Sequence, residues 1–332
     1  MSQVQTVTGP IDAADLGRTL VHEHLRISYW GEEWDRNYTW KRADTVALAV
    51  DKMAELIDAG FRTFVDPCPI ELGRDPLLYQ EVAERSGMQI VCTTGFYTEH
   101  EGWGLPLYWR ARDPEEIAEH YVAELQDGIA GTDGIRPGAI KAATGAVVTD
   151  AERRVLTGAG MAQHESDVAI ITHTEHSLHG DVQQDLFADA GADLGRCLIG
   201  HQDEATEVAP IRKLAERGTF VGMDRVGLEI IAPDARRADH VAALVHEGFT
   251  SHVCLSQDHI CTMTAPRRSM WSPPERRAAM EPMREQIEWQ VWKRPYTYLV
   301  TDFVPMLLER GVTEADVETM LVDNPRRLLA GA

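Results

Sequence analysis

The residues with the clearest potential for chemistry each stand at the end of a short apolar run. His22 and His24 close the run that begins at Thr19, and residues two apart in a strand project to the same face. Four further candidates stand in or at the ends of later runs: Lys141 follows Ala139-Ile140, and the others are His173, His201 and Asp258. Imidazole and carboxylate ligands favour zinc, with cobalt, manganese or iron as alternatives. Each side chain taken singly has a structural explanation, but the whole set predicts one metal site.

Lys141 is the exceptional member of this set, because a protonated amine does not bind a metal. One interpretation is a buried or salt-bridged lysine with no role in chemistry. The other is a lysine carbamylated by carbon dioxide, which would supply a bridging carboxylate. The residues alone leave both interpretations open.

The elements that must position these residues alternate between apolar runs and helical patterns. The runs are continuous rather than alternating, which is typical of parallel strands covered on both faces. They are Thr19–His24, Thr63–Pro67, Gln89–Gly95, Gly138–Ala143, Val168–Thr174, Arg196–His201, Thr219–Asp224 and His252–Asp258. Helical patterns separate them; one begins at Asp113-Pro114, where an aspartate cap precedes a proline at the first helical position.

This alternation predicts an α/β fold, a (β/α)8 TIM barrel in which residues 1–332 form a single domain. In such a barrel all strand ends named above point to the catalytic face. The alternative, an open doubly wound sheet, needs a glycine-rich turn after the first strand, where this chain has His22-Glu23-His24.

Composition indicates which binding partners and which cellular compartment to expect for this chain. The formal net charge of -21 repels phosphate backbones, so we expect no nucleic-acid partner. No apolar run approaches the length of a membrane span, and no secretory signal precedes the first strand, so we expect a cytoplasmic protein. The odd number of cysteines forms no CxxC pair, which predicts buried free thiols: Cys68, Cys92, Cys197, Cys254 and Cys261.

A series of short motifs runs in order from about residue 4 to about residue 329. They are Gly9-Pro10-Ile11-Asp12, Leu16-Gly17, Val21-His22-Glu23-His24, Thr63-Phe64-Val65-Asp66-Pro67, Leu72-Gly73-Arg74-Asp75, Ile140-Lys141, Ile171-Thr172-His173-Thr174, Ile199-Gly200-His201, Gly222-Met223-Asp224-Arg225 and Asp323-Asn324-Pro325-Arg326. With these motifs the chain resembles the phosphotriesterase family of the amidohydrolase superfamily, and it is most similar to that family's phosphotriesterase-like lactonase branch.

The resemblance implies a division of roles among the six candidate ligands. His22, His24 and Asp258 would hold a buried divalent ion, while His173 and His201 would hold a more exposed one. Carbamylated Lys141 and a hydroxide would bridge the two ions. Zinc is the expected metal, with cobalt, manganese or iron possible. Relatives of this kind also imply a homodimer.

Two further residues speak to the substrate. Lactonases of the family carry a tyrosine after the third strand and an arginine after the seventh, and Tyr97 and Arg225 match them. The resemblance therefore implies a lactonase acting on acyl-homoserine, aliphatic or sugar lactones, with weak phosphotriesterase activity. Asp258 would carry a proton to the leaving alkoxide, Tyr97 would stabilise the oxyanion, and Arg225 would orient loops or substrate. The plainer interpretation is that Tyr97 packs in the barrel mouth and Arg225 forms a structural ion pair.

Three other functions remain open on sequence grounds. The protein could be primarily an organophosphate phosphotriesterase, a mononuclear amidohydrolase, or a non-catalytic zinc-binding barrel scaffold. The segment 261–298 is where the chain departs most from lactonases, whose corresponding loop forms the acyl-chain pocket. Here that segment is longer and more charged, which argues less for acyl-homoserine lactones, so the expected small-molecule lactone or ester substrate is not narrowed to one lactone class.

Overall fold

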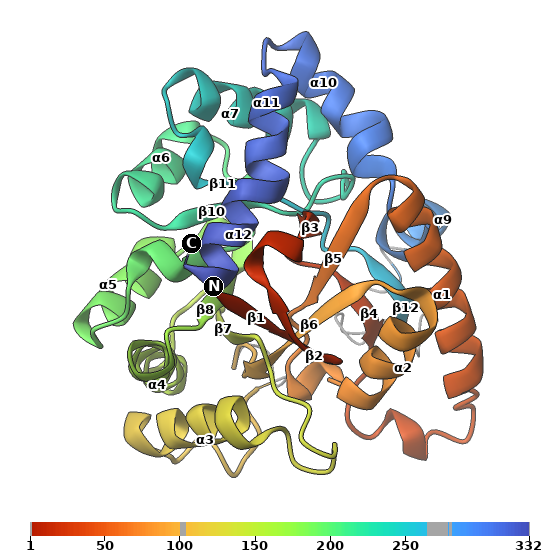
Figure 1. Cartoon of the computed structure of the whole chain (residues 1–332), viewed down its shortest axis with the longest axis vertical. Coiled ribbons are helices and arrows are strands. Elements are labelled where there is room, and N and C mark those ends of the chain that lie inside the picture. The colour runs from red at the N-terminus through yellow and green to blue at the C-terminus, as the bar shows by residue number, and fades with distance from the viewer. Residues whose placement is uncertain (1, 100–103, 264–277, 279–280, 332) are drawn as a thin grey trace.

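Eight parallel strands curl into a barrel at the centre of the molecule, with helices around its outside (Figure 1). The structure is a computed structural model and describes residues 2–99, 104–263, 278 and 281–331. The strands follow the sheet order β11-β10-β9-β8-β7-β6-β5-β3. Their bounds are β3 Arg18–Leu20, β5 Phe61–Asp66, β6 Gln89–Gly95, β7 Ala139–Thr144, β8 Ala169–Thr174, β9 Cys197–Ile199, β10 Phe220–Met223 and β11 Val253–Leu255. The predicted (β/α)8 TIM barrel is confirmed.

Continuous apolar sequence forms these strands because both of their faces are covered. All six residues of β7 are buried, and so are all six of β8. Side chains directed outward meet the helices, while those directed inward fill the barrel. A lysine or histidine that ends such a strand is therefore held at low exposure among tightly packed neighbours.

The barrel closes at a seam that the sequence does not predict. The expected strand Thr19–His24 is wrong as a single element, because β3 ends at Leu20 and a second strand, β4 (His24–Ile27), begins three residues after Val21. β4 pairs in parallel with β12 (Ile260–Met263). Between these pairs, the Asp258 N–H donates to the His22 carbonyl at 3.0 Å. The chain bends at the seam, so His22 lies in the bend rather than in a strand.

The helices agree with the predicted patterns where capping signals were strong. Asp113 accepts a hydrogen bond from the Glu116 N–H at 2.9 Å and starts α3 as expected. The sequence reading missed α2, which begins after the Asp75 cap, and the helices after residue 281. The described helices are α1 Arg42–Asp58, α2 Pro76–Ser86, α3 Pro114–Asp127, α4 Asp150–Ser166, α5 Gly180–Asp189, α6 Val208–Glu216, α7 Asp234–His246, α9 Arg284–Glu288, α10 Val304–Glu309, α11 Glu314–Glu318 and α12 Asn324–Ala330.

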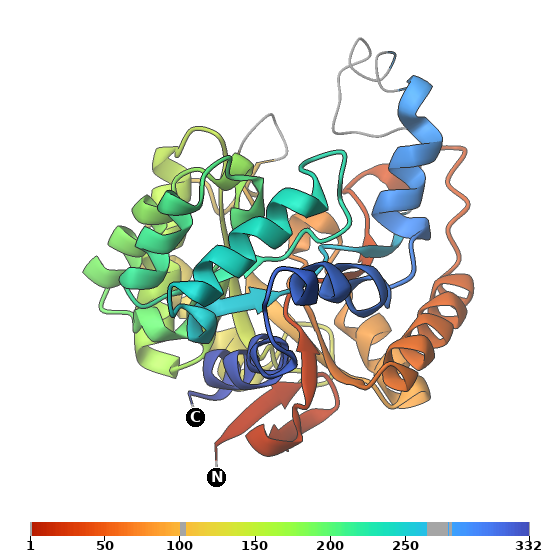
Figure 2. The ribbon, with the colours of Figure 1, turned by 90° about the horizontal axis from the view of Figure 1, so that it is seen from above.

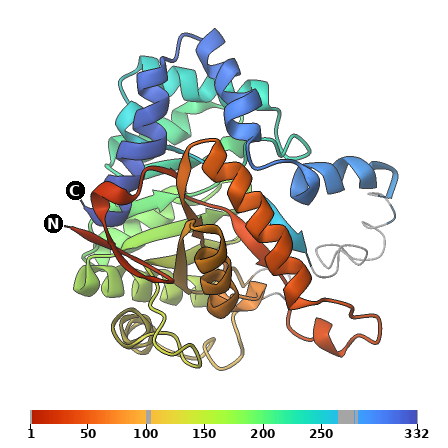
Figure 3. The same cartoon turned by 45° about the vertical axis from the view of Figure 1, so that its right-hand side comes forward.

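The two ends of the barrel differ in what covers them. The hairpin of β1 (Gln3–Thr6) and β2 (Gly9–Asp12) lies at the same end as α12 and both chain termini (Figure 2). The carboxyl ends of the strands open on the opposite side, where loops rather than terminal segments surround the barrel. α1 and α2 lie side by side against the outside of the barrel (Figure 3).

Two expectations about composition can be compared with the structure. All five cysteines are buried and free, as predicted. Within the described ranges, no helix combines the length and apolar character needed to cross a membrane. Much of the long segment 261–298, including Trp271 and the Pro273-Pro274 pair, lies outside the described residues, so its predicted part in substrate choice stays a prediction.

Candidate metal centre

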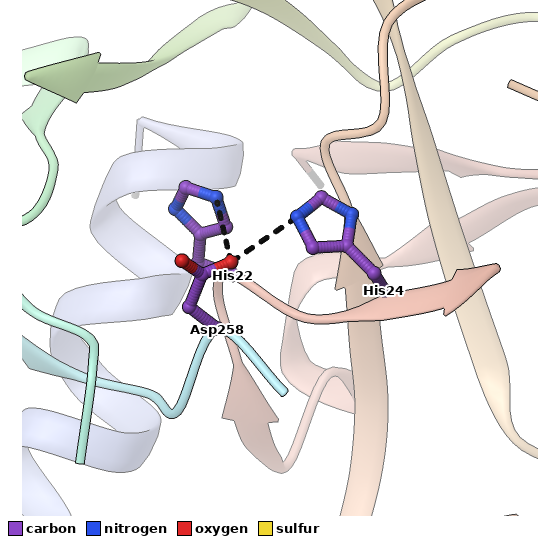
Figure 4. Close-up of side chains that lie close together, drawn as sticks. All are labelled: His22, His24 and Asp258. Carbon is purple, nitrogen blue, oxygen red and sulfur yellow. Dashed lines mark ion pairs between the residues drawn. The ribbon is translucent and has the colours of Figure 1, made fainter. Parts of the chain in front are cut away.

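Three of the predicted ligands converge at the barrel seam. Asp258 Oδ1 lies 3.3 Å from His24 Nε2 and 3.9 Å from His22 Nε2. Figure 4 shows both imidazoles directed towards this carboxylate. One ligand atom from each of the three residues falls within 4.8 Å of the others, so the group could hold a metal ion. The bend that breaks the first strand is what brings His22 and His24 to Asp258 from two directions.

The other three predicted ligands lie directly beside this group. Lys141 Nζ, on β7, is 3.4 Å from His22 Nε2. The ring of His201, which follows β9, lies 4.6 Å from the rings of both His22 and His173. The four histidines and Lys141 are buried, whereas the Asp258 side chain is 16% exposed. The structure therefore brings all six residues to one place at the carboxyl ends of the strands.

Buried carboxylates behind the histidines are functional features that the sequence reading did not identify. Asp224 lies after β10, with one oxygen 2.8 Å from His201 Nδ1 and the other 3.2 Å from His22 Nδ1. Asp66 ends β5 and lies 3.3 Å from His24 Nδ1. A carboxylate only accepts, so each contact places an imidazole proton on Nδ1 and makes Nε2 the nitrogen that would bind a metal. The available signal was an aspartate at the end of a buried strand.

His173 is placed differently from the other histidines. Its Nε2 lies 3.1 Å from Glu175 Oε2, so Nδ1 is the nitrogen that remains for a ligand. Its ring neighbours His201, yet it is absent from the three-residue groups whose ligand atoms already lie within 4.8 Å of one another in the described chain. Its predicted role as a ligand stays a prediction.

The electrostatics of the site favour a bound cation. Burial lowers the pKa of His22 to about 4, which keeps its imidazole neutral and able to coordinate. Burial also acts to lower the pKa of His24, but the carboxylates of Asp258 and Asp66 outweigh it and raise that pKa well above its usual value. Burial would raise the pKa of Asp258, yet the surrounding histidines and Arg225 hold it well below its usual value. The ionised carboxylate of Asp258 and the neutral imidazole of His22 are donors suited to a divalent ion, and His24 would join them when the ion displaces its Nε2 proton.

Lys141 has the protonation behaviour that a bridging carbamate requires. Burial lowers the pKa of its amine to about 8, against the opposing charges of Asp258 and Asp224. The neutral amine is the form that adds carbon dioxide, and a lowered pKa makes that form accessible near neutral pH.

Backbone strain marks two of the candidate ligands. His201 has a φ of 57° and Asp258 a φ of 46°, both in the left-handed region, which is uncommon for residues other than glycine although aspartate and histidine enter it more often than most. Strain of this kind costs about 1–3 kcal/mol per residue and persists where the surrounding structure enforces it. Here it turns both side chains into the barrel mouth.

The two predicted substrate residues lie at the edge of the same cluster. The Tyr97 ring is 5.0 Å from the His173 ring and is half-buried, and burial raises the pKa of its hydroxyl well above its usual value. The hydroxyl therefore remains a hydrogen-bond donor. Arg225 Nε donates to Asp258 Oδ2 at 3.0 Å, and its guanidinium also pairs with Glu204. The plain interpretation of Arg225 as an ion pair is thus correct in part, because its partner is a candidate ligand.

Comparison with known proteins places this geometry among hydrolases. The sequence profile of the phosphotriesterase family matches residues 2–329. A phosphotriesterase homology protein of Mycobacterium tuberculosis is 35% identical, covering 99% of this chain and 98% of the relative. An aryldialkylphosphatase of Saccharolobus solfataricus is 30% identical over 96% and 97% of the two chains. A solved variant of a phosphotriesterase-like lactonase from Deinococcus radiodurans is 35% identical, with a TM-score of 0.86 over 98% and 99% of the chains.

Proposed function

Because the chain belongs to the phosphotriesterase family of hydrolases, we propose that it is a lactonase that opens lactone esters and hydrolyses phosphotriesters weakly. His22, His24 and Asp258 would hold one divalent ion, and His173 and His201 a second. Lys141, carbamylated, would bridge them, with zinc as the expected metal. When bound, two such ions supply a hydroxide at neutral pH and polarise the ester oxygen.

The contact between Arg225 and Asp258 is the observation that carries the proposal. The guanidinium holds one oxygen of Asp258 at 3.0 Å, while the other oxygen faces His24 at 3.3 Å. A guanidinium does not give up or relay a proton at any ordinary pH. A proton taken up by Asp258 therefore does not leave through Arg225, and the substrate side of this partly exposed carboxylate is an open route for it.

This restriction suits a lactone better than an aryl phosphotriester. Ring opening of a lactone releases an alkoxide that needs a proton and stays attached to the same molecule, within reach of Asp258. An aryloxide leaves readily without protonation, so a phosphotriester makes no use of the returned proton. Asp258 is thus assigned as the group that moves the proton, and Arg225 as the group that keeps Asp258 ionised and oriented.

Tyr97 adds a neutral donor at the mouth of the site. Its ring packs edge-on against His173, and its hydroxyl stays protonated because burial raises its pKa. A fixed neutral donor stabilises charge that develops on an ester oxygen during attack. The proposal gives Tyr97 that role, towards the carbonyl or ring oxygen of the lactone.

A phosphotriesterase as the primary activity is the second candidate. It is favoured by the 30% identity to a relative named aryldialkylphosphatase across nearly the whole of both chains. Both candidate functions use the same six ligands, so only the relative rates of lactone and phosphotriester hydrolysis distinguish them.

The test is a panel of substrates on the zinc-loaded enzyme, with acyl-homoserine, aliphatic and sugar lactones beside dialkyl aryl phosphates. We expect kcat/KM for the best lactone to exceed that for the best phosphotriester by about 100-fold, or roughly 2.7 kcal/mol of transition-state stabilisation. The variant His24→Ala, purified identically, controls for contaminating hydrolases. A phosphotriester preferred over every lactone would overturn the assignment in favour of the second candidate.

A further inference from the structure

Glu23 is a fully buried carboxylate that stands between two candidate ligands and takes no part in the mechanism above. Its Oε1 accepts hydrogen bonds from the Ser256 hydroxyl and the Gln257 N–H, both at 2.7 Å. Its Oε2 accepts one from the His259 N–H at 2.9 Å. Three buried donors depend on this one side chain for an acceptor, and each buried donor without an acceptor costs about 1–3 kcal/mol of stability.

The residues that donate to Glu23 bracket Asp258 on both sides. Gln257 precedes the aspartate and His259 follows it, while the Asp258 N–H itself donates to the His22 carbonyl at 3.0 Å. Ser256 also supplies its hydroxyl oxygen to the His22 N–H at 3.0 Å. The segment that carries Asp258 is thus attached, residue by residue, to the segment that carries His22 and His24.

This attachment replaces strand pairing at the barrel seam. β3 and β11 are the two outer strands of the eight-stranded order, and regular pairing resumes across the seam only between β4 and β12. Between them the backbone of Asp258 adopts a φ of 46°, and the His259 carbonyl accepts the His24 N–H at 2.9 Å where the β4–β12 pairing begins. The Glu23 carboxylate supplies the acceptors that a neighbouring strand would otherwise provide.

We propose that Glu23 is a positioning residue that locks the strained 256–259 segment and so fixes Asp258 between His22 and His24 for metal binding. The inference rests on the metal site of the proposed function. Without this carboxylate, the amides on either side of Asp258 lose their acceptors, and the left-handed conformation loses what enforces it. The distance between Asp258 and its two histidines would then vary.

The structure offers a matched control for this idea. Glu152 is also fully buried, and it too accepts on Oε1 from two groups, the N–H of Glu99 at 2.9 Å and that of Gly145 at 3.1 Å. Its Oε2 accepts from the Thr149 N–H at 3.0 Å. These partners lie on loops and a helix start, not on the seam. Glu23→Gln and Glu152→Gln therefore make the same chemical change to the same kind of site.

The experiment measures metal binding as well as turnover in these two variants. Each protein is stripped, reloaded with cobalt or zinc, and followed by metal content, chelator competition and the visible spectrum of the cobalt form. We expect Glu23→Gln to bind one of the two ions about 10- to 100-fold more weakly, with an altered cobalt spectrum and a lower kcat at similar KM. Glu152→Gln should keep native metal affinity and a native cobalt spectrum, even if its urea unfolding midpoint falls as much as that of Glu23→Gln.

Two results would overturn the positioning role. One is native affinity for both ions and a native cobalt spectrum in Glu23→Gln; the other is an equal loss in Glu152→Gln. If Glu23→Gln does not fold, Ser256→Ala removes one donor only and should show a smaller change in the same direction, with native behaviour counting against the proposal. These metal readouts do not depend on which ester is hydrolysed, so failure of the lactonase assignment is distinguishable from failure here.

Discussion

The proposed role of Tyr97 can be tested by removing a single oxygen atom from its side chain. Tyr97→Phe removes the hydroxyl and keeps the ring that packs against His173 at 5.0 Å. We expect kcat/KM for lactones to fall about 10- to 100-fold, or roughly 1.4–2.7 kcal/mol, because a fixed donor to the developing charge is lost. Metal content should not change. Turnover within about twofold of the native rate would show that Tyr97 only packs in the mouth.

Glu71 gives a pH-dependent prediction at the same scale. Burial raises the pKa of this carboxyl to about 7, while its Oε1 accepts the Tyr97 N–H at 3.1 Å and its Oε2 has no hydrogen-bond partner among the described residues. A folded-state pKa above the unfolded value means that the folded protein holds the proton more tightly. Between pH 4.5 and 7 this group therefore lowers stability as pH rises, and above about 7 its effect is constant.

Glu71→Gln should remove that dependence while keeping the acceptor for the Tyr97 N–H. Relative to the native protein, we expect the variant to gain on the order of 1–3 kcal/mol of unfolding free energy between pH 5 and pH 8. Urea unfolding at several pH values measures it. A constant difference between the two proteins across that range would mean that Glu71 is not protonated in the folded state.

The six ligand candidates could be predicted because each is a chemically distinctive side chain at the end of an apolar run. The groups that hold them could not. Asp224 and Asp66 are aspartates among many in a chain with 53 acidic residues, and their position at the end of a buried strand does not say which histidine each contacts. Their contacts join residues about 20 to 200 positions apart, such as Asp224 to His22, and such contacts exist only after the barrel closes.

At the scale of elements, Gly95 is a position on β6 where a side chain would collide with the backbone of β7. It ends β6 with a φ of 121°, and a Cβ built there would lie 2.0 Å from the carbonyl oxygen of Lys141 on β7. Gly95→Ala should therefore push Lys141 away from His22. We expect a loss of several kcal/mol of stability by urea unfolding, about 2–4, together with a lower metal content.

The control for this substitution is Gly9→Ala in the β1–β2 hairpin. Gly9 has a similar φ of 117° but open space within 4 Å of the added Cβ. It thus reports the backbone strain alone. If Gly95→Ala were no more destabilising than Gly9→Ala and kept its metal, close packing of β6 on β7 would not be what positions Lys141.

The sequence predicts regular elements better than the irregular ones on which the site depends. Long apolar runs and capping residues such as Asp113 identify strands and helices because their signals are local. The break between β3 and β4 has no local signal, since Thr19–His24 is apolar enough to continue as a strand. It is set by Asp258 and its neighbours, more than 230 residues away, which attach to His22 and Glu23.

At the scale of the whole molecule, the six candidate ligands come from strands distributed around the barrel. β7 carries Lys141, β8 carries His173, and the segments after β9 and β11 carry His201 and Asp258. A metal pair held by all of them would link strands that are far apart in sequence. The barrel and its catalytic face can be predicted from the alternation of apolar runs and helical patterns in the sequence. The ester substrate cannot, because it depends on loops, including the segment 261–298, about which that alternation gives no information.

The most direct measurement is a zinc titration of the metal-free protein in bicarbonate buffer, with the initial rate of lactone hydrolysis recorded at each addition. We expect the rate to rise until two zinc ions per chain are present and then to stay constant. Lys141→Ala, titrated in parallel, should reach a much lower plateau and recover partly with a short carboxylic acid. A native plateau at one ion per chain, or turnover independent of zinc, would contradict a binuclear lactonase.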